Sequence, residues 1–354
     1  MSGGVDSSVA AKLMVDDGFE CIGCTMKLFH NEDVGLERSR TCCSLDDVAD
    51  ARRVAYKLGM SFYVFNFTAA FHDTVLRKFM ECYQNGCTPN PCIDCNRYMK
   101  FGKHFDRAKM LCCDYVVTGH YARIEESSGG FVLKKAIDET KDQSYVLYSM
   151  TQEQLARTKF PLGGMRKTEV RALAEQNGFV NADKPDSQDI CFVPDGDYAR
   201  VIELQTGCCS PTGNFVDQDG NVLGTHRGIV HYTIGQRKGL GISASEPLYV
   251  CGIRPENNTV VLGKKEALFT TQAEVAVFNW ISGHAPDDKF RCKVKIRYRQ
   301  PEQWATVAPD GECAVRIVFD EPQRAVTPGQ AAVLYDGDVV LGGGTIRVAE
   351  QTGT

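Results

Sequence analysis

The sequence predicts an α/β protein with a doubly wound parallel sheet, followed by a small helical central segment and by β-barrel domains at the C-terminal end. Three observations predict this architecture. Short apolar runs in the first half alternate with helical stretches of about 10 to 15 residues, as in parallel sheets. A glycine-rich motif, 2–8, precedes the first helical stretch. The last third changes to short alternating runs between turn pairs, as in small barrels.

Length and composition limit the classes to which this protein can belong. The 354 residues, 43% of them apolar, are enough for two or three domains with cores of their own. The net charge of −5 argues neither for nor against nucleic-acid binding, because phosphate contacts need only a local basic patch. No apolar stretch of about 18 residues is present and the start resembles no signal peptide, so we expect a cytoplasmic protein without a membrane span.

The elements of the first half follow from apolar periodicity. Val5, Val9 and Leu13 recur every four residues and mark one face of a helix, which Gly18 ends. We expect further helices at 45–58, 71–83 and 168–178, and strands at 19–29, 61–67 and 115–119.

The rest of the chain divides in two by its pattern. The stretch 144–207 reads as mostly helical. Beyond it, turn pairs such as Asp310-Gly311 separate alternating runs such as 292–297. We therefore expect a nucleotide-binding catalytic domain at 1–200, a small β-rich domain at 201–270 and a β-barrel domain at 271–354.

The motif from Ser2 to Ser8 favours phosphate binding. Gly3 and Gly4 let the backbone approach a phosphate closely, and the helix that follows supplies free N–H groups. Ser7 and Ser8 add hydroxyl donors, and Asp6 is suited to help hold Mg²⁺. The spacing of a Walker loop is absent.

This motif resembles the PP-loop of the ATP pyrophosphatases, an adenine nucleotide alpha hydrolase-like fold whose members cleave ATP to AMP and pyrophosphate. In that family a buried strand precedes the loop, whereas this sequence starts on the loop. Loss of a central strand would leave backbone groups of its neighbours unpaired. We therefore expect that the assigned start of the chain lies too late.

Sixteen cysteines in a reducing compartment are expected to be mostly small buried residues. Cys21 and Cys24 lie in a predicted strand, where they face opposite sides. The side chains of adjacent cysteines diverge, so structural or incidental roles are expected for the pairs 42–43, 112–113 and 208–209.

Cys92 and Cys95 differ from the other cysteines, because Pro89 and Pro91 fix an extended lead-in and a CxxC on a first helical turn can converge. Arg97 and Lys100 lie close in sequence and favour the thiolate. A redox pair, a metal-ligand pair and a catalytic thiol all stay open, with metal binding first on spacing alone. Cys191, in a polar loop entering an apolar run, would by itself be read as a core residue.

Together with the loop, two cysteine segments change this interpretation. The segment 90–101 and the later segment 186–192 resemble those of the tRNA-specific 2-thiouridylases (MnmA family). Further pieces of the sequence fit the same family in order: 26–27, 118–121, 141–145, 235–241, 297–300 and 327–330. The resemblance covers nearly the whole chain apart from the strand before the loop.

The resemblance implies a role for each matching residue. Cys95 matches the catalytic nucleophile and Cys191 the cysteine that carries a persulfide, with a transient disulfide between the two. The matching ATP contacts are Met1, Ser2, Gly3, Gly4, Val5, Asp6, Ser7, Met26 and Gly119. The target-base contacts are Asn90, Pro91 and Cys92, and the tRNA contacts are His120, Lys141, Asp142, Gln143, Arg297, Tyr298 and Gln330.

The sequence departs from the family at position 92, where many members have Asp after the Asn-Pro pair. This chain has Cys92, with Asp94 two residues on, so which group transfers a proton stays open. Ligation of an iron–sulfur cluster by Cys92, Cys95 and Cys191 ranks below the persulfide route but stays an alternative.

The resemblance implies ATP-dependent adenylation of the wobble uridine at O2, followed by sulfur transfer that gives 2-thiouridine, AMP and pyrophosphate. The implied partners are Mg²⁺, the tRNAs for Lys, Glu and Gln, and a cysteine desulfurase or sulfur-relay protein. We expect the loop 181–189 to become ordered when tRNA binds.

A basic strand face also favours RNA binding. Positions 291, 293, 295, 297 and 299 are all Arg or Lys at alternate positions, so they share one face. Two rival interpretations are a PP-loop enzyme acting on a small molecule and a non-catalytic RNA-binding protein with a cysteine-bound metal.

Overall fold

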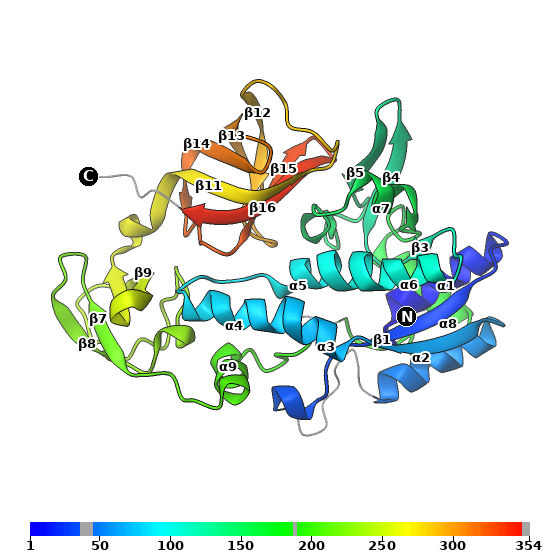
Figure 1. Ribbon diagram of the computed structural model, residues 1–354, viewed down its shortest axis with the longest axis horizontal. Helices are drawn as coiled ribbons and strands as arrows, with labels where there is room; N and C mark the ends of the chain where they lie inside the picture. The colour runs from blue at the N-terminus through cyan, green and yellow to red at the C-terminus, as the bar shows by residue number, and fades with distance from the viewer. Residues whose placement is uncertain (36–44, 187–189, 349–354) are drawn as a thin grey trace.

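A computed structural model describes residues 1–35, 45–186 and 190–348. Three parts follow one another along the chain (Figure 1). An α/β part with two long helices comes first, a small β-rich part follows, and a closed barrel forms the C-terminal part. The barrel lies above the long helices in the view of Figure 1, and the small β-rich part lies beyond their far end.

The α/β part is built from short parallel strand pairs and helices. β1 (Ile22–Lys27) pairs with β2 (Ser61–Asn66), and β3 (Val116–Val117) pairs with β6 (Thr158–Lys159). The apolar stripe of α1 (Val5–Asp16) packs with residues of α2 (Leu45–Lys57) and α8 (Lys167–Gln176). That shared core contains Val5, Val9, Val54, Val170 and Ala174.

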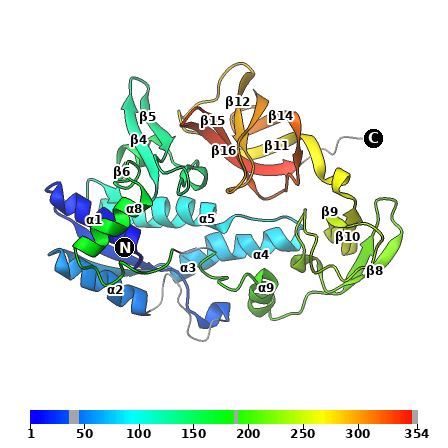
Figure 2. The same ribbon diagram turned by 180° about the vertical axis from the view of Figure 1, so that it is seen from behind.

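Two long helices cross the middle of the molecule (Figure 2). The first joins α3 (Thr68–Phe71), a π-helical turn (His72–Leu76) and α4 (Arg77–Gln84). The second joins α5 (Pro91–Asp94), a π-helical stretch (Cys95–Lys103) and α6 (His104–Met110). π-Helical turns inside helices often mark functional sites, and this one begins at Cys95.

The small β-rich part follows α7 (Gln152–Ala156), α8 and α9 (Tyr198–Thr206). Its sheet has the order β8-β7-β10-β9 and is packed around Phe215, Tyr232 and Val260. The four strands are β7 (Gly213–Val216), β8 (Val222–His226), β9 (Tyr249–Arg254) and β10 (Thr259–Gly263).

The C-terminal barrel is closed, because its first and last strands, β11 and β16, pair with each other. Closure removes the free edges that would invite other strands. Cys292 and Val294 point into the barrel core from β12, as the alternating pattern predicts. The six strands are β11 (Phe269–Trp280), β12 (Phe290–Lys295), β13 (Gln303–Pro309), β14 (Ala314–Arg324), β15 (Ala331–Asp336) and β16 (Val339–Val348).

A hairpin from the first half of the chain joins the barrel sheet, which the sequence did not predict. β4 (Ala122–Ser127) and β5 (Gly130–Lys135) form the hairpin, and Leu133 pairs with Val340 of β16. Arg123 Nη2 also lies 2.5 Å from the Asp338 carboxylate at the turn before β16. The α/β part and the barrel are therefore joined by backbone pairing.

The predicted order of elements is confirmed, with an α/β part first and the β-rich parts after it. One detail differs from the expected sheet. Within the described residues the parallel strands form two separate pairs, and the expected strand at 19–29 is shortened to 22–27. No helix in the described part of the chain is long and apolar enough to cross a membrane.

Candidate functional site

The glycine-serine loop lies at the N-terminal end of α1, as the sequence predicts. The hydroxyls of Ser7 and Ser8 both donate to the Gly4 carbonyl over 3.1 Å and fix the turn. Gly3 has φ +74°, and a Cβ there would collide with the backbone of Asp47. Only glycine satisfies both demands, so the loop is shaped by close backbone approach.

Gly119 lies against this loop, which brings two predicted ATP-contact segments together. A Cβ on Gly119 would lie 2.7 Å from the carbonyl carbon of Asp6 and 2.8 Å from the amide nitrogen of Ser7. Thr25, the neighbour of Met26 in β1, donates from Oγ1 to the Met1 carbonyl over 2.6 Å. β1 and the segment that follows β3 thus both border the loop.

Asp6 of the loop is held by two side chains that the sequence did not single out for this role. Lys167 Nζ lies 2.7 Å and 2.9 Å from the two Asp6 carboxylate oxygens. The Tyr121 hydroxyl donates to the same carboxylate over 2.8 Å. Lys167 is only 8% exposed, so this ammonium lies in a largely desolvated position. Buried charges require such pairing.

Lys167 also reaches Asp186, the first residue of the predicted persulfide-cysteine segment. Its ammonium lies 2.8 Å from Asp186, which additionally pairs with Lys141 at 2.8 Å and with Arg171 at 2.9 Å. Burial by itself would raise the pKa of Asp186, but the hydrogen bonds from Lys141 and Lys167 outweigh it and lower the pKa to about 2. One buried cation therefore links the glycine-serine loop to Asp186, which begins the segment that leads to Cys191.

Asn181 and Lys184, which precede this segment in the chain, also contact the glycine-serine loop. Asn181 Nδ2 donates to the Gly3 carbonyl over 3.0 Å and to Ser8 Oγ over 2.9 Å. Lys184 Nζ donates to the Gly3 carbonyl over 3.3 Å and pairs with Asp47 and Asp50 of α2. The predicted loop 181–189 is described as far as 186, and its positions 187–189 lie outside the described residues.

The CxxC segment begins the second long helix. Pro91 occupies the first turn of α5, and Asn90 accepts a backbone hydrogen bond from Ile93 over 3.1 Å. Cys92 is exposed and Cys95 is half-buried. Residues three apart on a helix lie on the same side, so both thiols can face one substrate.

Asp94 points away into the protein and pairs with Lys78 of α4, with a separation of 2.5 Å. Burial raises the pKa of the Asp94 carboxyl, and Lys78 partly offsets the rise.

Cys95 and Cys191 both pack against the same hydrophobic core. That core includes Phe192, whose ring lies 5.7 Å from Phe71 and 5.2 Å from Phe79. The fold thus brings the two predicted catalytic segments to one core from distant parts of the chain. The pair 42–43 lies outside the described residues.

The iron–sulfur alternative has no support in the geometry. Among the residues that the structure describes, no three His, Cys, Asp or Glu side chains gather at a point that could hold a metal ion. Cys92, Cys95 and Cys191 are all described, so they do not form a three-thiolate site in this conformation.

Two predicted tRNA contacts border the segment 90–92. The Tyr298 hydroxyl donates to the Asp142 carbonyl over 3.0 Å. Burial raises the pKa of the Tyr298 phenol, the charge of Asp142 raises it further, Arg299 opposes the rise, and Cys92 adds a smaller increase. Gln330 Nε2 donates over 2.9 Å to the Thr88 carbonyl, two residues before Asn90. Residues from three distant segments therefore frame the predicted target-base site.

Two other predicted tRNA contacts, His120 and Gln143, face inward. His120 is buried, with Nε2 3.3 Å from Lys100 Nζ and Nδ1 2.7 Å from Thr118 Oγ1. Burial, and then Lys100, hold the pKa of His120 well below its usual value. Gln143 Oε1 accepts from the Tyr121 amide over 3.0 Å.

Arg297 joins the barrel to the small β-rich part. Its guanidinium donates to Thr327 Oγ1 over 2.7 Å and to the Ala325 carbonyl over 3.1 Å. A longer contact of 3.4 Å reaches the Ile234 carbonyl. Burial lowers the pKa of this guanidinium. In this structure Arg297 therefore fixes the loop that carries Gln330.

The basic face of β12 is observed as an alternating pattern. Positions 292, 294 and 296 are buried, whereas 291, 293 and 295 are exposed or half-buried. The expected face also included 297 and 299, but β12 ends at Lys295, so these two arginines lie in the bend and turn beyond the strand. Trp304 of β13 was not predicted from the sequence. It is 48% exposed and lies between the cationic side chains of Arg291 and Lys293. Its ring centroid is 5.2 Å from the Arg291 guanidinium and 5.6 Å from Lys293 Nζ. Lys295 Nζ lies 5.8 Å from the Tyr298 ring.

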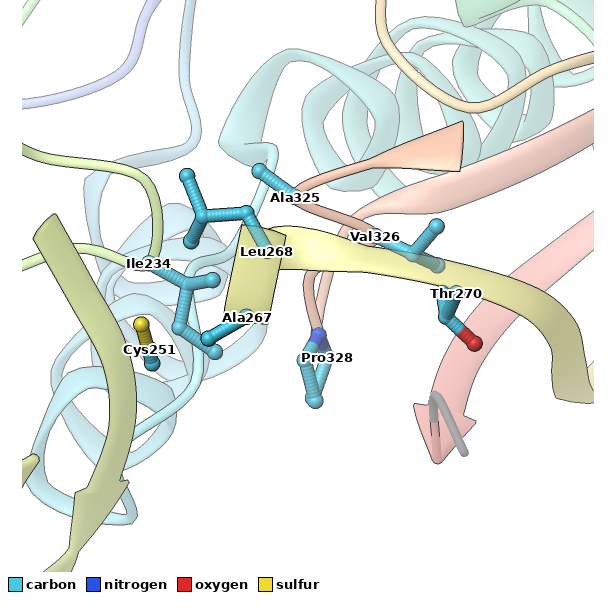
Figure 3. Close-up of a pocket in the computed structure, with 8 residues that line it drawn as sticks. All are labelled: Ile234, Cys251, Ala267, Leu268, Thr270, Ala325, Val326 and Pro328. Carbon is cyan, nitrogen blue, oxygen red and sulfur yellow. The ribbon is translucent and has the colours of Figure 1, made fainter. Parts of the chain in front are cut away.

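An apolar cavity of about 80 Å³ lies where the small β-rich part meets the barrel (Figure 3). Ile234, Leu268 and Val326 are among its lining side chains. It lacks charged groups in its lining and is formed by other elements than the loop of α1. We therefore do not assign it to the nucleotide.

Three of the missed residues, Lys167, Arg171 and Tyr121, could not have been found from local pattern. Lys167 precedes a predicted helix, where a lysine ordinarily faces solvent. Arg171 and Tyr121 sit among other polar residues with no spacing that distinguishes them. Trp304 offered a signal, because the chain has only two tryptophans and one of them stands in a polar stretch beside the basic strand.

Comparison with known proteins covers the whole chain. A family model described as tRNA methyl transferase HUP domain matches residues 1–195. A tRNA methyl transferase PRC-barrel domain matches 204–264, and an aminomethyltransferase beta-barrel domain matches 270–346.

Curated proteins match at full length. A protein of Clostridioides difficile is 50% identical over 98% of this chain and 96% of its own length. One from Symbiobacterium thermophilum is 50% identical over 99% of this chain and 91% of its own length. One from Acetivibrio thermocellus is 48% identical over 98% of each chain. All three are named tRNA-specific 2-thiouridylase MnmA.

Proposed function

The chain belongs to the family of tRNA-specific 2-thiouridylases, and on that premise we propose that it adenylates the wobble uridine of tRNA at O2 and replaces that oxygen with sulfur. We further propose that Cys191 carries the sulfur as a persulfide and that Cys95 is the nucleophile. The observation that carries this proposal is the buried link Asp6–Lys167–Asp186, which joins the nucleotide loop to the Cys191 segment.

The first step makes a poor leaving group into a good one. The uridine O2 attacks the α-phosphorus of ATP, the bond to the bridging oxygen breaks, and pyrophosphate leaves. The amides at the start of α1 and the hydroxyls of Ser2 and Ser7 are suited to hold the pyrophosphate. Mg²⁺ bound with the nucleotide offsets the phosphate charge, and Asp6 is the loop carboxylate suited to hold it.

Lys167 couples this step to the sulfur carrier. In the structure its ammonium is shared between two carboxylates, Asp6 and Asp186. A polyphosphate on the loop brings negative charge beside the same ammonium and competes for it. Nucleotide binding therefore alters how firmly Asp186 holds the start of the Cys191 segment. Lys167 acts as a positioning residue for both substrates.

The second step transfers sulfur, and it can follow either of two routes. In one route, the terminal sulfur of the Cys191 persulfide attacks C2, AMP leaves, and Cys95 then cleaves the remaining S–S bond. In the other, the Cys95 thiolate attacks Cys191 Sγ and frees hydrosulfide, which attacks C2. Both leave a Cys95–Cys191 disulfide, and a thiol reductant supplies the two electrons that reset it. Asp94 stays a candidate proton acceptor.

The tRNA is proposed to lie across the base-contact segment and the β12 face. The target base must leave the anticodon stack to reach Cys95. Tyr298 lies beside Lys295 of β12, and this aromatic and basic surface suits an RNA backbone with unstacked bases. We propose the tRNAs for Lys, Glu and Gln as substrates, a desulfurase or relay protein as sulfur donor, and the cytoplasm as the site of action.

Thiol chemistry, rather than methyl transfer, fits the cysteines. The matching domain models carry methyl transferase in their descriptions, whereas the curated relatives are named for thiolation. Cys95 and Cys191 on one core favour the second name.

The test is mass analysis of tRNA nucleosides after incubation with ATP, Mg²⁺ and a persulfide source. The unaltered protein should form 2-thiouridine, while Cys95→Ser and Cys191→Ser should form none. Both variants should keep tRNA-dependent exchange of pyrophosphate into ATP, because neither thiol takes part in adenylation. Cys208→Ser, at an exposed and distant cysteine, is the matched control. Undiminished thiolation by Cys191→Ser would refute the assigned carrier, and exchange that responds only to small carboxylates would refute the substrate.

A further inference from the structure

Two cysteines outside the proposed reaction meet at the C-terminal end of α4. The helix ends at Gln84, and Gly86 adopts φ +70°. The Gly86 amide donates to the Tyr83 carbonyl over 3.0 Å, and the Cys87 amide donates to the Cys82 carbonyl over 2.9 Å. These two bonds define a Schellman motif, which brings the side chains at its first and last positions into contact. Here those positions are Cys82 and Cys87.

The two thiols interact directly. They occupy the two positions that this motif brings into contact, both are free, and both are half-buried. The Cys87 thiol also donates to the Asn85 carbonyl over 3.6 Å. The hydrogen bond from Cys82 lowers the pKa of Cys87 to about 7, although burial opposes the shift. A thiol with such a pKa is partly thiolate at neutral pH, and the thiolate is the nucleophilic form.

We propose that Cys82 and Cys87 form a redox-active dithiol, which small disulfide molecules such as glutathione disulfide oxidise reversibly to an internal disulfide. The Cys87 thiolate attacks one sulfur of the small disulfide and releases the first thiolate. Cys82 then loses its proton, attacks Cys87 Sγ and releases the second. The net change is two protein thiols and one small disulfide to one protein disulfide and two small thiols. Excess thiol runs the exchange backwards.

The position of this pair gives its oxidation a consequence. Gly329 packs on it so closely that a Cβ at 329 would lie 2.8 Å from Cys82 Sγ and 2.9 Å from the Thr88 carbonyl oxygen. The Thr88 amide in turn donates to the Pro328 carbonyl over 2.9 Å. Forming the S–S bond draws the sulfurs closer than hydrogen-bond contact and changes the packing against this barrel loop. This contact between the end of α4 and the barrel loop at 328–329 lies directly before the segment 90–92 in the chain.

Peptide mapping tests the disulfide without reference to any activity. The reduced protein is exposed to graded glutathione disulfide, its remaining thiols are blocked, and it is digested with trypsin and chymotrypsin. Cleavage after Tyr83 separates Cys82 from Cys87, so an internal disulfide holds two peptides together. We expect the linked pair to appear, to vanish on adding excess thiol, and to be absent in Cys87→Ser. Thermal melting confirms that each variant is folded.

Two comparisons keep the test specific. Cys92→Ser should still form the linked pair, because Cys92 lies outside the motif. The exposed neighbours Cys208 and Cys209 should form only mixed disulfides with glutathione, since adjacent side chains diverge. Mixed disulfides alone at Cys87, or a linked peptide that depends on Cys92, would overturn the proposal.

A second measurement tests the consequence, which rests on the proposed function. Binding of fluorescent tRNA is compared for the reduced and the oxidised protein. We expect roughly tenfold weaker tRNA binding after oxidation, which corresponds to about 1.4 kcal/mol. Cys87→Ser should lose this sensitivity. Unchanged affinity with the disulfide demonstrably formed would overturn the consequence, whereas failure of both states to bind tRNA would count against the proposed function instead.

Discussion

Replacing Lys167 with methionine removes one buried charge and keeps most of the side-chain volume. In the protein its ammonium joins Asp6 and Asp186 at 2.7 Å and 2.8 Å, with only 10% of the side chain exposed. The variant leaves two carboxylates close together with less compensation. Asp186 keeps Lys141 and Arg171, but Asp6 keeps only the Tyr121 hydroxyl among the contacts described above.

The expected size of the effect follows from burial. Removing one partner of a fully buried ion pair costs roughly 3–5 kcal/mol. Here the carboxylates are 32% and 24% exposed, so water screens part of the loss. We expect about 2 kcal/mol in the free energy of unfolding, within the range of large single-site effects. Loss of one charge-assisted hydrogen bond to phosphate should raise the KM for ATP roughly 10- to 100-fold.

The assay combines urea unfolding with ATP–pyrophosphate exchange. Lys12→Met is the matched control, because Lys12 forms an exposed pair with Asp16 on α1 and should cost only about 0.5 kcal/mol. Combining Lys167→Met with Asp186→Asn should cost less than the sum of the single changes, since the two share one interaction. A Lys167→Met protein with the stability and KM of the Lys12→Met control would refute the coupling argument.

Three further predictions rest on separate observations. Gly119→Ala should lower ATP–pyrophosphate exchange at least about tenfold and cost roughly 1–3 kcal/mol, because its Cβ meets the loop backbone. Gly164→Ala, which meets nothing within 4 Å, should be nearly neutral, and equal behaviour of the two would contradict this account. The folded pKa of Asp186, about 2, lies below its unfolded value, so its contribution is present above about pH 4 and is lost as the pH falls towards 2. The stability gap between the protein and Asp186→Asn should therefore narrow on acidification, and a constant gap would argue against the ion pairs. Trp304→Ala should weaken tRNA binding by about 1 kcal/mol, with Trp304→Tyr largely restoring it. Since Trp280 is buried, quenching of tryptophan fluorescence by tRNA should disappear with Trp304→Ala; persistent quenching would remove Trp304 from the interface.

Several features of the site could be predicted from sequence because they depend on neighbours along the chain. Apolar spacing gave α1, α2 and α8, and alternation gave the inward and outward faces of β12. The glycines and serines of 2–8 predict a phosphate-binding loop, since few other residue types permit that backbone path. The resemblance in the cysteine segments then pointed to Cys95 and Cys191.

Partners far apart in the chain could not be predicted in this way. Lys167 lies 161 positions from Asp6, and its place before a helix gives no sign that it is buried. The predicted contacts His120 and Arg297 looked like free polar side chains but are enclosed by neighbours from other segments.

By itself, the sequence determined the local elements, the glycine-serine loop before α1 and the family resemblance that singles out Cys95 and Cys191, because each depends on residues close together in the chain. Only the tertiary structure decided which charges meet. It placed one lysine between the loop and the Cys191 segment, paired the β4–β5 hairpin with the barrel, and set Cys82 against Cys87 beside Gly329. The physical reason is that an ion pair or a thiol contact depends on distance and burial in space, which local pattern does not encode.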